Sequence, residues 1–476
     1  MAKFEPYFEK NAGDSVARSH TITGWDPEDQ AAWQAGGEAI ARRNLLWSVA
    51  AEHVGFSVWS LWSVMILFMP QSVYGLTAGD KFLVAATATL VGSALRLPYT
   101  MATARFGGRN WTVFTAGVLV LPVVATIVVL AEPGRPLWVY LACAALCGLG
   151  GGNFASSMTN INAFFPQRLK GRALGINAGG GNIGVPAVQL VGLFVIAIAG
   201  NRQPYWVCVF YLVALVVAGI GAARYMNNLD IVSVDTGAMR AALRNRHTWL
   251  VSLLYIGTFG SFIGFSFAFG QVLQISFTAG GQSAAQASLH AAEIAFIGPL
   301  LGSVARVYGG RFADRAGGGP VTLWAFVGMI GGVGILAVTA TLAGHHTTTA
   351  SMTWYVIGFV ILFLLSGIGN GAVYKMIPSI FEAASRSLEA DEKTRADYSR
   401  SMSGAVIGIT GAVGGLGGVV INLMLRSSYL THGTATAAFW DFAAFYAIAA
   451  FVTLRVYVRM PSGSAADQPT LVRARA

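Results

Sequence analysis

Twelve long apolar stretches dominate this sequence and limit the folds that it can adopt. They fall at residues 44–70, 80–104, 111–131, 137–164, 173–199, 204–226, 248–277, 284–308, 320–343, 352–381, 401–426 and 436–459. A helix needs about 20 apolar residues to cross a bilayer, whereas the strands of a membrane β-barrel alternate in polarity. Charged residues make up 11% of the chain, against about 25% in soluble proteins. The sequence therefore predicts an all-α polytopic membrane protein and excludes a soluble enzyme or a disordered chain.

A polar segment, NNLDIVSVDTGAMRAALRNRH, separates the sixth stretch from the seventh. It divides the chain into a six-helix half at 44–226, a linker at 227–247 and a second six-helix half at 248–459. Cytoplasmic tails are expected at 1–43 and 460–476. The first of these is polar with mixed charges, so we expect no cleavable signal there.

Basic residues fall on one side of this topology. If the N-terminus is inside, the loops after the even-numbered stretches are cytoplasmic, and they hold Arg105, Arg109, Arg168, Lys170, Arg172, Arg240, Arg244, Arg246, Arg311, Arg315, Arg386, Lys393, Arg395 and Arg400. The opposite loops hold only Lys81, Arg135 and Arg202. Because cytoplasmic loops are rich in Lys and Arg, we expect both termini on the cytoplasmic face of the inner (plasma) membrane. The same bias explains the net charge of +10 without nucleic-acid binding.

The two halves repeat each other. SALRLPYTMATARFGGR in the second stretch matches SVARVYGGRFADR in the eighth, and LCGLGGGNFASSM in the fourth matches LSGIGNGAVYKM in the tenth. GINAGGGNIG in the fifth matches GITGAVGGLGG in the eleventh. All three pairs are offset by six stretches in the same direction, which is the parallel repeat of transporters that bind substrate between two rocking halves.

Each half has one arginine deep in a predicted helix, Arg96 and Arg306. Such a residue costs at least about 2.5–3.5 kcal/mol in a membrane and usually faces a cavity or a partner. Two guanidinium groups facing each other can clamp a planar oxyanion with their forked donors. The alternative is that each arginine pairs with backbone carbonyls or with a carboxylate, for which Glu52 and Glu293 are available.

Small and aromatic residues surround these arginines in the sequence. Glycines let membrane helices approach closely, and we expect four of them to act in gating: Gly179, Gly180, Gly414 and Gly415. Two asparagines among the glycines either bind substrate oxygens or link helices: Asn177 and Asn182. Four aromatic residues either line the cavity or belong to the core: Phe56, Phe154, Tyr255 and Phe259.

Titratable residues within the stretches suggest proton coupling, since transporters use such groups as relays. The candidates are Glu52, His53, Glu293 and Lys375. Alternatively, Glu52 and Lys375 form a buried ion pair, and His53 is an ordinary hydrogen-bonded histidine. Asp314, near the end of the eighth stretch, is expected to act in a gate latch by pairing with a loop arginine or capping a helix.

Other chemistry has no support in the sequence. There is no GxxxxGK[ST] motif for a nucleotide-driven pump. The three cysteines, Cys143, Cys147 and Cys208, lie within apolar stretches and are expected in the core. We therefore expect a transporter rather than an enzyme, with no metal and no cofactor.

The segment GGGNFASSMTNINAFFPQRLKGRALGINAGGGNIG resembles the nitrate signature of the nitrate/nitrite porter (NarK-type) family of the major facilitator superfamily. The segments GITGAVGGLGG, ALRLPY, SLLYIGTFGSFIGFS and GPLLGSVARVYGGRFADR also match that family. The resemblance covers nearly the whole chain and implies twelve helices in two pseudo-symmetric halves. It further implies nitrate bound between Arg96 and Arg306, surrounded by Phe56, Phe154, Asn182, Tyr255 and Phe259.

The resemblance leaves two coupling schemes open. Exchanger-like members have apolar residues in place of Glu52 and His53 and a neutral polar residue in place of Lys375, so this chain is more similar to the branch that couples nitrate uptake to protons. Nitrate/proton symport, which would serve nitrate assimilation, is the favoured scheme. The alternative is proton-independent nitrate/nitrite antiport. An anion channel or a receptor is disfavoured by the repeat and by the short tails, and a monomer suffices for either scheme.

Overall fold

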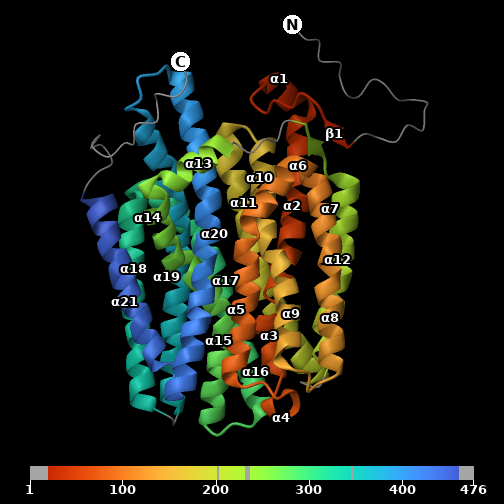
Figure 1. Cartoon of the computed structure of the whole chain (residues 1–476), viewed down its shortest axis with the longest axis vertical. Coiled ribbons are helices and arrows are strands. Elements are labelled where there is room, and N and C mark those ends of the chain that lie inside the picture. Colours follow the sequence, from red (N-terminus) through yellow and green to blue (C-terminus); the bar gives the residue numbers. More distant parts are fainter. Residues whose placement is uncertain (1–19, 201–202, 231–235, 345–346, 460–476) are drawn as a thin grey trace, which may run out of the picture.

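The computed structural model describes residues 20–200, 203–230, 236–344 and 347–459 as a helical bundle (Figure 1). The first half contains β1 (Thr21–Ile22), α1 (Gln30–Ala32), η1 (Trp33–Gly37), α2 (Glu38–Trp59), α3 (Trp62–Met65), η2 (Ile66–Phe68), α4 (Gln71–Tyr74), α5 (Ala78–Ala94), α6 (Arg96–Phe106), α7 (Gly108–Val118), α8 (Val120–Ala131), α9 (Leu137–Cys147), η3 (Gly148–Gly152), α10 (Asn153–Phe164), α11 (Gln167–Ala199) and α12 (Tyr205–Tyr225). The linker contains β2 (Asn228–Leu229) and α13 (Thr236–Arg244). The second half contains α14 (Arg246–Tyr255), η4 (Ile256–Gly260), α15 (Ser261–Ala279), α16 (Ala284–Ala295), α17 (Ile297–Ala316), α18 (Gly318–Ala343), α19 (Thr349–Ser385), α20 (Glu392–His432), α21 (Thr436–Thr453) and η5 (Leu454–Val458).

The predicted number of membrane spans is confirmed. Within the described residues, 11 helical units are long and apolar enough to cross a membrane, and the bent pair α5–α6 makes the twelfth. Several spans extend beyond the apolar stretches that predicted them: α20 runs over Glu392–His432, where 401–426 was expected. The reason is that polar and charged residues continue the helix past the apolar region. The tail expected at 460–476 and residues 1–19 lie outside the described chain.

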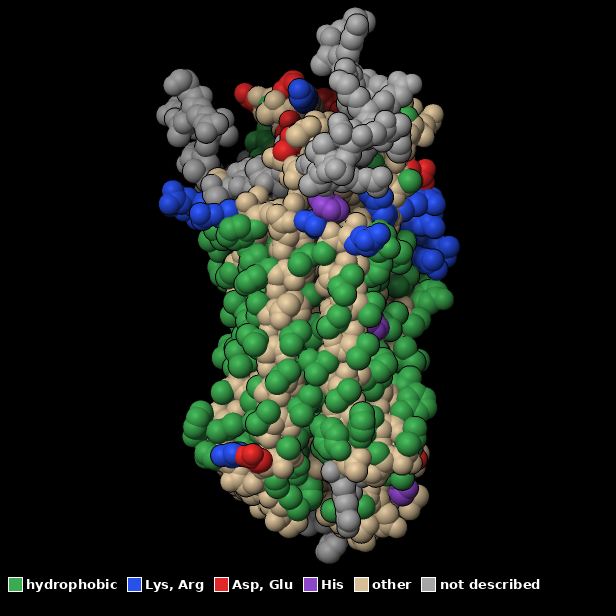
Figure 2. All heavy atoms as spheres, turned by 90° about the vertical axis from the view of Figure 1, so that its right-hand side faces the viewer, with side chains coloured by type: hydrophobic (Ala, Val, Ile, Leu, Met, Phe, Trp, Pro, Cys, Tyr) green, Lys and Arg blue, Asp and Glu red, His purple; other side chains and the backbone are tan. Residues whose placement is uncertain are grey.

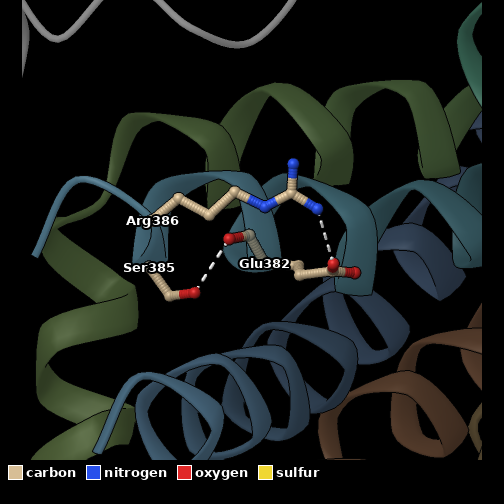
Figure 3. Close-up of polar contacts among 3 residues, drawn as sticks. All are labelled: Glu382, Ser385 and Arg386. Carbon is tan, nitrogen blue, oxygen red and sulfur yellow. Dashed lines mark hydrogen bonds and ion pairs between the residues drawn. The ribbon is translucent and has the colours of Figure 1, made fainter. Parts of the chain in front are cut away.

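One helix end shows how a span passes into polar surroundings. α19 ends at Ser385, whose hydroxyl donates to the Glu382 carbonyl at 2.8 Å. Arg386 reaches back to the Glu382 carboxylate at 2.9 Å (Figure 3). Both charged side chains are more than half exposed, so this ion pair lies at the surface and adds little to stability.

The two ends of the bundle differ in charge. We call the end that holds β1 and α13 the upper end, and the end that holds α4 and α16 the lower end (Figure 1). Lys and Arg side chains gather near the upper end of the face in Figure 2, and hydrophobic side chains cover its middle. This distribution follows the charge asymmetry of the sequence, from which the cytoplasmic orientation of the upper end remains a prediction.

Close glycine contacts give the two halves the same internal packing. A Cβ added at Gly151 would lie 2.7 Å from the Cα of Gly92, and one added at Gly367 would lie 3.0 Å from the Cα of Gly302. These pairs join η3 to α5 in the first half and α19 to α17 in the second. The backbones of the paired helices can approach this closely only because side chains are absent. The repeat predicted from sequence is therefore also a repeat of helix contacts.

Hydrogen bonds and ring contacts between the halves form a seal toward the lower end. The Leu67 carbonyl in η2 accepts from the Gln274 amide at 3.0 Å and from the Ser288 hydroxyl at 2.8 Å. The Gln189 amide donates to the Ser266 carbonyl at 2.8 Å. Phe82 of α5 also stacks on Tyr429 of α20, with ring centroids 5.5 Å apart.

The described part of the expected N-terminal tail is docked on the first half. β1 pairs in parallel with β2, so it is joined to the start of the linker. The ring of Trp25 packs edge-on against Phe164 at 5.5 Å, and the Glu28 carboxylate accepts from the backbone of Gln167 at 2.7 Å. Residues 20–43 therefore hold the linker and the start of α11 together at the upper end.

The glycine contacts can be tested by adding one methyl group. We expect Gly367→Ala to lower the free energy of unfolding by about 1–3 kcal/mol, because the new Cβ would press on the backbone of α17. Melting in detergent measures the effect. Gly334→Ala on α18 is the matched control, because a Cβ there meets no atom within 4 Å. Equal melting temperatures for both variants would contradict the proposed packing.

Candidate functional site

Arg96 lies at a break in the second span. α5 ends at Ala94 and α6 begins at Arg96, with a bend of 40° between them. The Arg96 side chain is 1% exposed, and its Nη1 donates to the carbonyl of Gly411 in α20 at 2.7 Å. Its Nε and Nη2 atoms are buried without a hydrogen-bond partner. One arginine of the first half thus touches the second half and retains free donors.

Arg306 in α17 and Arg96 both lie within cation–π distance of one aromatic ring. The guanidinium carbon of Arg96 lies 5.0 Å from the ring centroid of Phe154, and that of Arg306 lies 5.6 Å from it. Phe154 is the second residue of α10, which directly follows the 3₁₀-helical segment η3. Phe56 stacks on Phe154 at 6.1 Å. The two arginines predicted from the repeat are therefore brought together, with two of the predicted aromatic residues beside them.

The second half supplies the opposite wall. Its seventh span widens into the π-helical turn η4, which holds Phe259 at 4.6 Å from the Arg96 guanidinium carbon. Tyr255 stacks on Phe259 at 5.1 Å and contacts Tyr374 of α19 at 4.7 Å. Irregular helix turns of this kind often occur at functional sites. All four predicted aromatic residues therefore surround the arginines.

Two aromatic neighbours of the arginines were not predicted. Tyr374 lies 5.4 Å from the Arg306 guanidinium carbon, and Trp59 lies 5.7 Å from that of Arg96. Tyr374 stands in GNGAVYKM, the repeat of the segment that contains Phe154, but Phe154 itself aligns with Val373 and the match does not identify Tyr374.

Several donors at this site lack an acceptor. Among the described residues, buried donors without a partner include Nη1 of Arg306 and the hydroxyls of Tyr255 and Tyr374. On α11, the donor nitrogen and the acceptor oxygen of the Asn182 amide are also buried and unpaired. Buried donors are normally paired, and an unpaired one costs about 1–3 kcal/mol. An anion with several oxygens between the guanidinium groups would provide the missing acceptors. The arrangement can therefore bind a small oxyanion.

Glu52 is the buried carboxylate of this region. It is 1% exposed and lies within electrostatic range of Arg306 and Arg96. Its Oε2 accepts hydrogen bonds from the Ser157 hydroxyl and, at 2.7 Å, from the Asn177 amide. Asn177, predicted to bind substrate or to link helices, therefore holds Glu52, while Ser157 was not predicted at all. The Oε1 atom of Glu52 has no partner.

The other proton-coupling candidates lie apart from the arginine pair. Glu293 is exposed on α16. Lys375 is half-exposed and pairs with Asp314 at 2.7 Å, so the alternative of a buried Glu52–Lys375 ion pair is wrong. Asp314 therefore has a lysine of α19 as its partner, where a loop arginine or a helix cap was expected. The physical reason is that Lys375 lies on a different face of α19 from the buried Asn370 and Val373. His53 is part-buried, with Nδ1 3.1 Å from the Gly180 carbonyl.

Comparison with known proteins identifies the family. Residues 53–420 match the model of the Major Facilitator Superfamily. The nitrate/nitrite transporter NarU of Salmonella typhimurium is 33% identical over 463 residues, which cover 92% of this chain and 96% of that one. A protein of Thermus thermophilus named as a probable nitrate/nitrite antiporter, NarK2, is 31% identical over 93% of this chain and 98% of its own length.

The chain belongs to the nitrate/nitrite porters of the major facilitator superfamily. It is therefore a membrane transporter and not an enzyme. The nitrite extrusion protein of Bacillus subtilis is more distant, with 28% identity over 84% of this chain and 90% of its own length. The solved structure of a nucleoside transporter, NupG, covers 87% of this chain and all of its own with a TM-score of 0.61. At 12% identity that likeness shows the fold alone.

The glycines predicted to gate this porter have different surroundings. Cβ atoms added at Gly414 and Gly415 would collide with Tyr255 and Ser93, respectively. A Cβ added at Gly180 would collide with Val49, whereas a Cβ added at Gly179 would meet no atom within 4 Å. Three of the four therefore mark close approaches, and their role in gating stays a prediction.

The contacts of both arginines with the Phe154 ring can be tested by replacing Phe154 with leucine. Each guanidinium would lose a cation–π contact worth about 0.5–2 kcal/mol, so we expect the melting temperature in detergent to fall clearly. Phe194→Leu is the matched control, because Phe194 is 57% exposed on the outer surface of α11. An equal effect of both substitutions would mean that Phe154 contributes only ordinary packing.

Proposed function

We propose that this porter transports nitrate and nitrite across the inner membrane by alternating access, with its upper end in the cytoplasm. The relatives are named as transporters or antiporters of these anions. The buried arginine pair and its unpaired donors suit a small planar oxyanion. The basic residues near the upper end favour the cytoplasmic orientation.

Within that activity we propose nitrate/proton symport, and the observation that carries this proposal is Glu52. A buried carboxylate near Arg96 and Arg306 leaves one net positive charge in the empty site. If nitrate binds and Glu52 takes a proton, the net charge is again one. Moving buried charge through the membrane is costly, so a site whose charge is the same in both states can reorient either empty or loaded.

His53 is a candidate for a second proton. Nitrate with one proton is electrically neutral, so the membrane potential would not drive its uptake. A further proton would make the loaded site one charge more positive than the empty one and would add about 2.3 kcal/mol of driving force per 100 mV. His53 adjoins Glu52 and contacts α11 through the Gly180 carbonyl, which places a second titratable group next to the first.

Proton-independent nitrate/nitrite antiport is the alternative. The Thermus thermophilus relative is named as a probable antiporter, and the arginine pair would serve this scheme equally well. Under antiport, an empty site would reorient poorly, so an anion would have to be carried in each direction. Glu52 would then have a structural role only.

Transport in proteoliposomes distinguishes the schemes. We expect an inward proton gradient to drive nitrate uptake without internal nitrite, and we expect Glu52→Gln to abolish this uptake while nitrate/nitrite exchange continues. Glu293→Gln is the matched control, since Glu293 is exposed. Uptake by the unmodified protein only with internal nitrite would instead establish antiport.

If the arginine pair binds the anion, replacing either arginine should weaken anion binding. We expect Arg96→Lys or Arg306→Lys to weaken nitrate binding by about tenfold or more, because lysine keeps the charge but loses the forked donors, and each charged hydrogen bond is worth about 1.5–3 kcal/mol. The nitrate dependence of thermal stabilisation measures it. Arg311→Lys, on the exposed part of α17, should bind like the unmodified protein; comparable binding by all three variants would place the anion elsewhere.

A further inference from the structure

One glycine of α11 makes the space that the Glu52 carboxyl occupies. A Cβ built at Gly181 would lie 2.5 Å from Cδ and 2.7 Å from Cγ of Glu52, and still closer to Oε1. No real Cβ approaches other atoms so closely, so any other residue at this position would require Glu52 to move.

Glu52 cannot move without losing its partners. The side chain is buried, and its Oε2 is held by Ser157 of α10 and Asn177 of α11. These two donors also bond to each other, with 2.8 Å between the Asn177 amide and the Ser157 hydroxyl. If the carboxyl were displaced, the Ser157 hydroxyl could still donate to the Phe154 carbonyl at 3.1 Å, but one buried N–H of Asn177 would lose its acceptor.

The oxygen next to Gly181 is also the one that is free to take a proton. Oε2 already accepts both hydrogen bonds, whereas the buried Oε1 has no partner. Protonation at Oε1 forms one O–H bond and leaves both existing hydrogen bonds in place. The contact with Gly181 thus concerns the reactive end of the side chain and not merely its packing.

We propose that Gly181 is a positioning residue: the space beside it fixes the position of the Glu52 carboxyl and thereby makes proton coupling possible. The proposal rests on the symport function above and deepens it. Gly181 was not among the glycines predicted to act in gating, and its role differs from theirs, because what fills the space beside it is a titratable side chain.

Neighbouring glycines of α11 provide the controls. At Gly175 a Cβ meets no atom within 4 Å, so Gly175→Ala tests the general effect of a methyl group on this helix. At Gly184 a Cβ would collide with the backbone carbonyl of His53, so Gly184→Ala tests a pure clash between helices α11 and α2. Only at Gly181 would the methyl group meet Glu52.

The experiment compares these variants in proteoliposomes. We expect Gly181→Ala to lower proton-driven nitrate uptake by about tenfold or more, since misplacing a reacting group by about 1 Å has effects of this order. Nitrate/nitrite exchange should stay within about twofold, because the arginines are untouched. Gly175→Ala should change neither rate. Full proton-driven uptake by Gly181→Ala, or equal loss of uptake and exchange, would overturn the proposal.

A double-mutant cycle of melting temperatures, with Gly181→Ala and Glu52→Ala, tests the contact between Gly181 and Glu52 independently of transport. If Gly181 serves Glu52, Gly181→Ala should lower the melting temperature in the unmodified background and have little effect in the E52A background. The effect of Gly184→Ala should be similar in both backgrounds. An unchanged effect of Gly181→Ala in the E52A background would overturn the proposal.

The two proposals fail in different ways. If the unmodified protein lacks proton-driven uptake, symport is refuted, and the coupling role of Gly181 is refuted with it, whatever the thermal cycle shows. If the unmodified protein is coupled and Gly181→Ala is coupled equally well, only the present inference fails.

Discussion

Two buried positive charges beside one phenyl ring are the interaction on which the rest of this structure depends. Arg96 and Arg306 come from different halves, and both lie over Phe154. Buried guanidinium groups are costly in a membrane unless something compensates them. The Gly411 carbonyl and the aromatic faces give partial compensation, and Glu52 lies close enough to contribute. The remaining deficit is the physical basis of the anion site that we propose.

The helices around this site are distorted where they carry its residues. The second span bends before Arg96, the turn η3 precedes Phe154, and the π-helical turn η4 holds Phe259. Glycine contacts such as that of Gly151 with Gly92 then let the helices pack closely. Local irregularity and missing side chains together place large aromatic and charged groups in a narrow space, which regular helices with ordinary side chains would not allow.

The sequence predicted the spans, the repeat and the arginine pair, because long apolar stretches and buried charges are strong signals in a membrane protein. It did not predict which side of a helix faces the site. In a helix that is apolar all round, periodicity does not distinguish the lipid side from the interior. For that reason Glu293 and Lys375 were grouped with Glu52, although the structure separates them, and Ser157 was overlooked.

The seal toward the lower end has a consequence for how readily the carrier can open there. Its hydrogen bonds join side-chain amides and hydroxyls of Gln274 and Ser288 to the Leu67 carbonyl. When the halves separate at that end, water can replace each partner, and the net loss per hydrogen bond is only about 0.5–1.5 kcal/mol. Each of these hydrogen bonds therefore costs little to exchange for water, which suits the alternating-access transport proposed above.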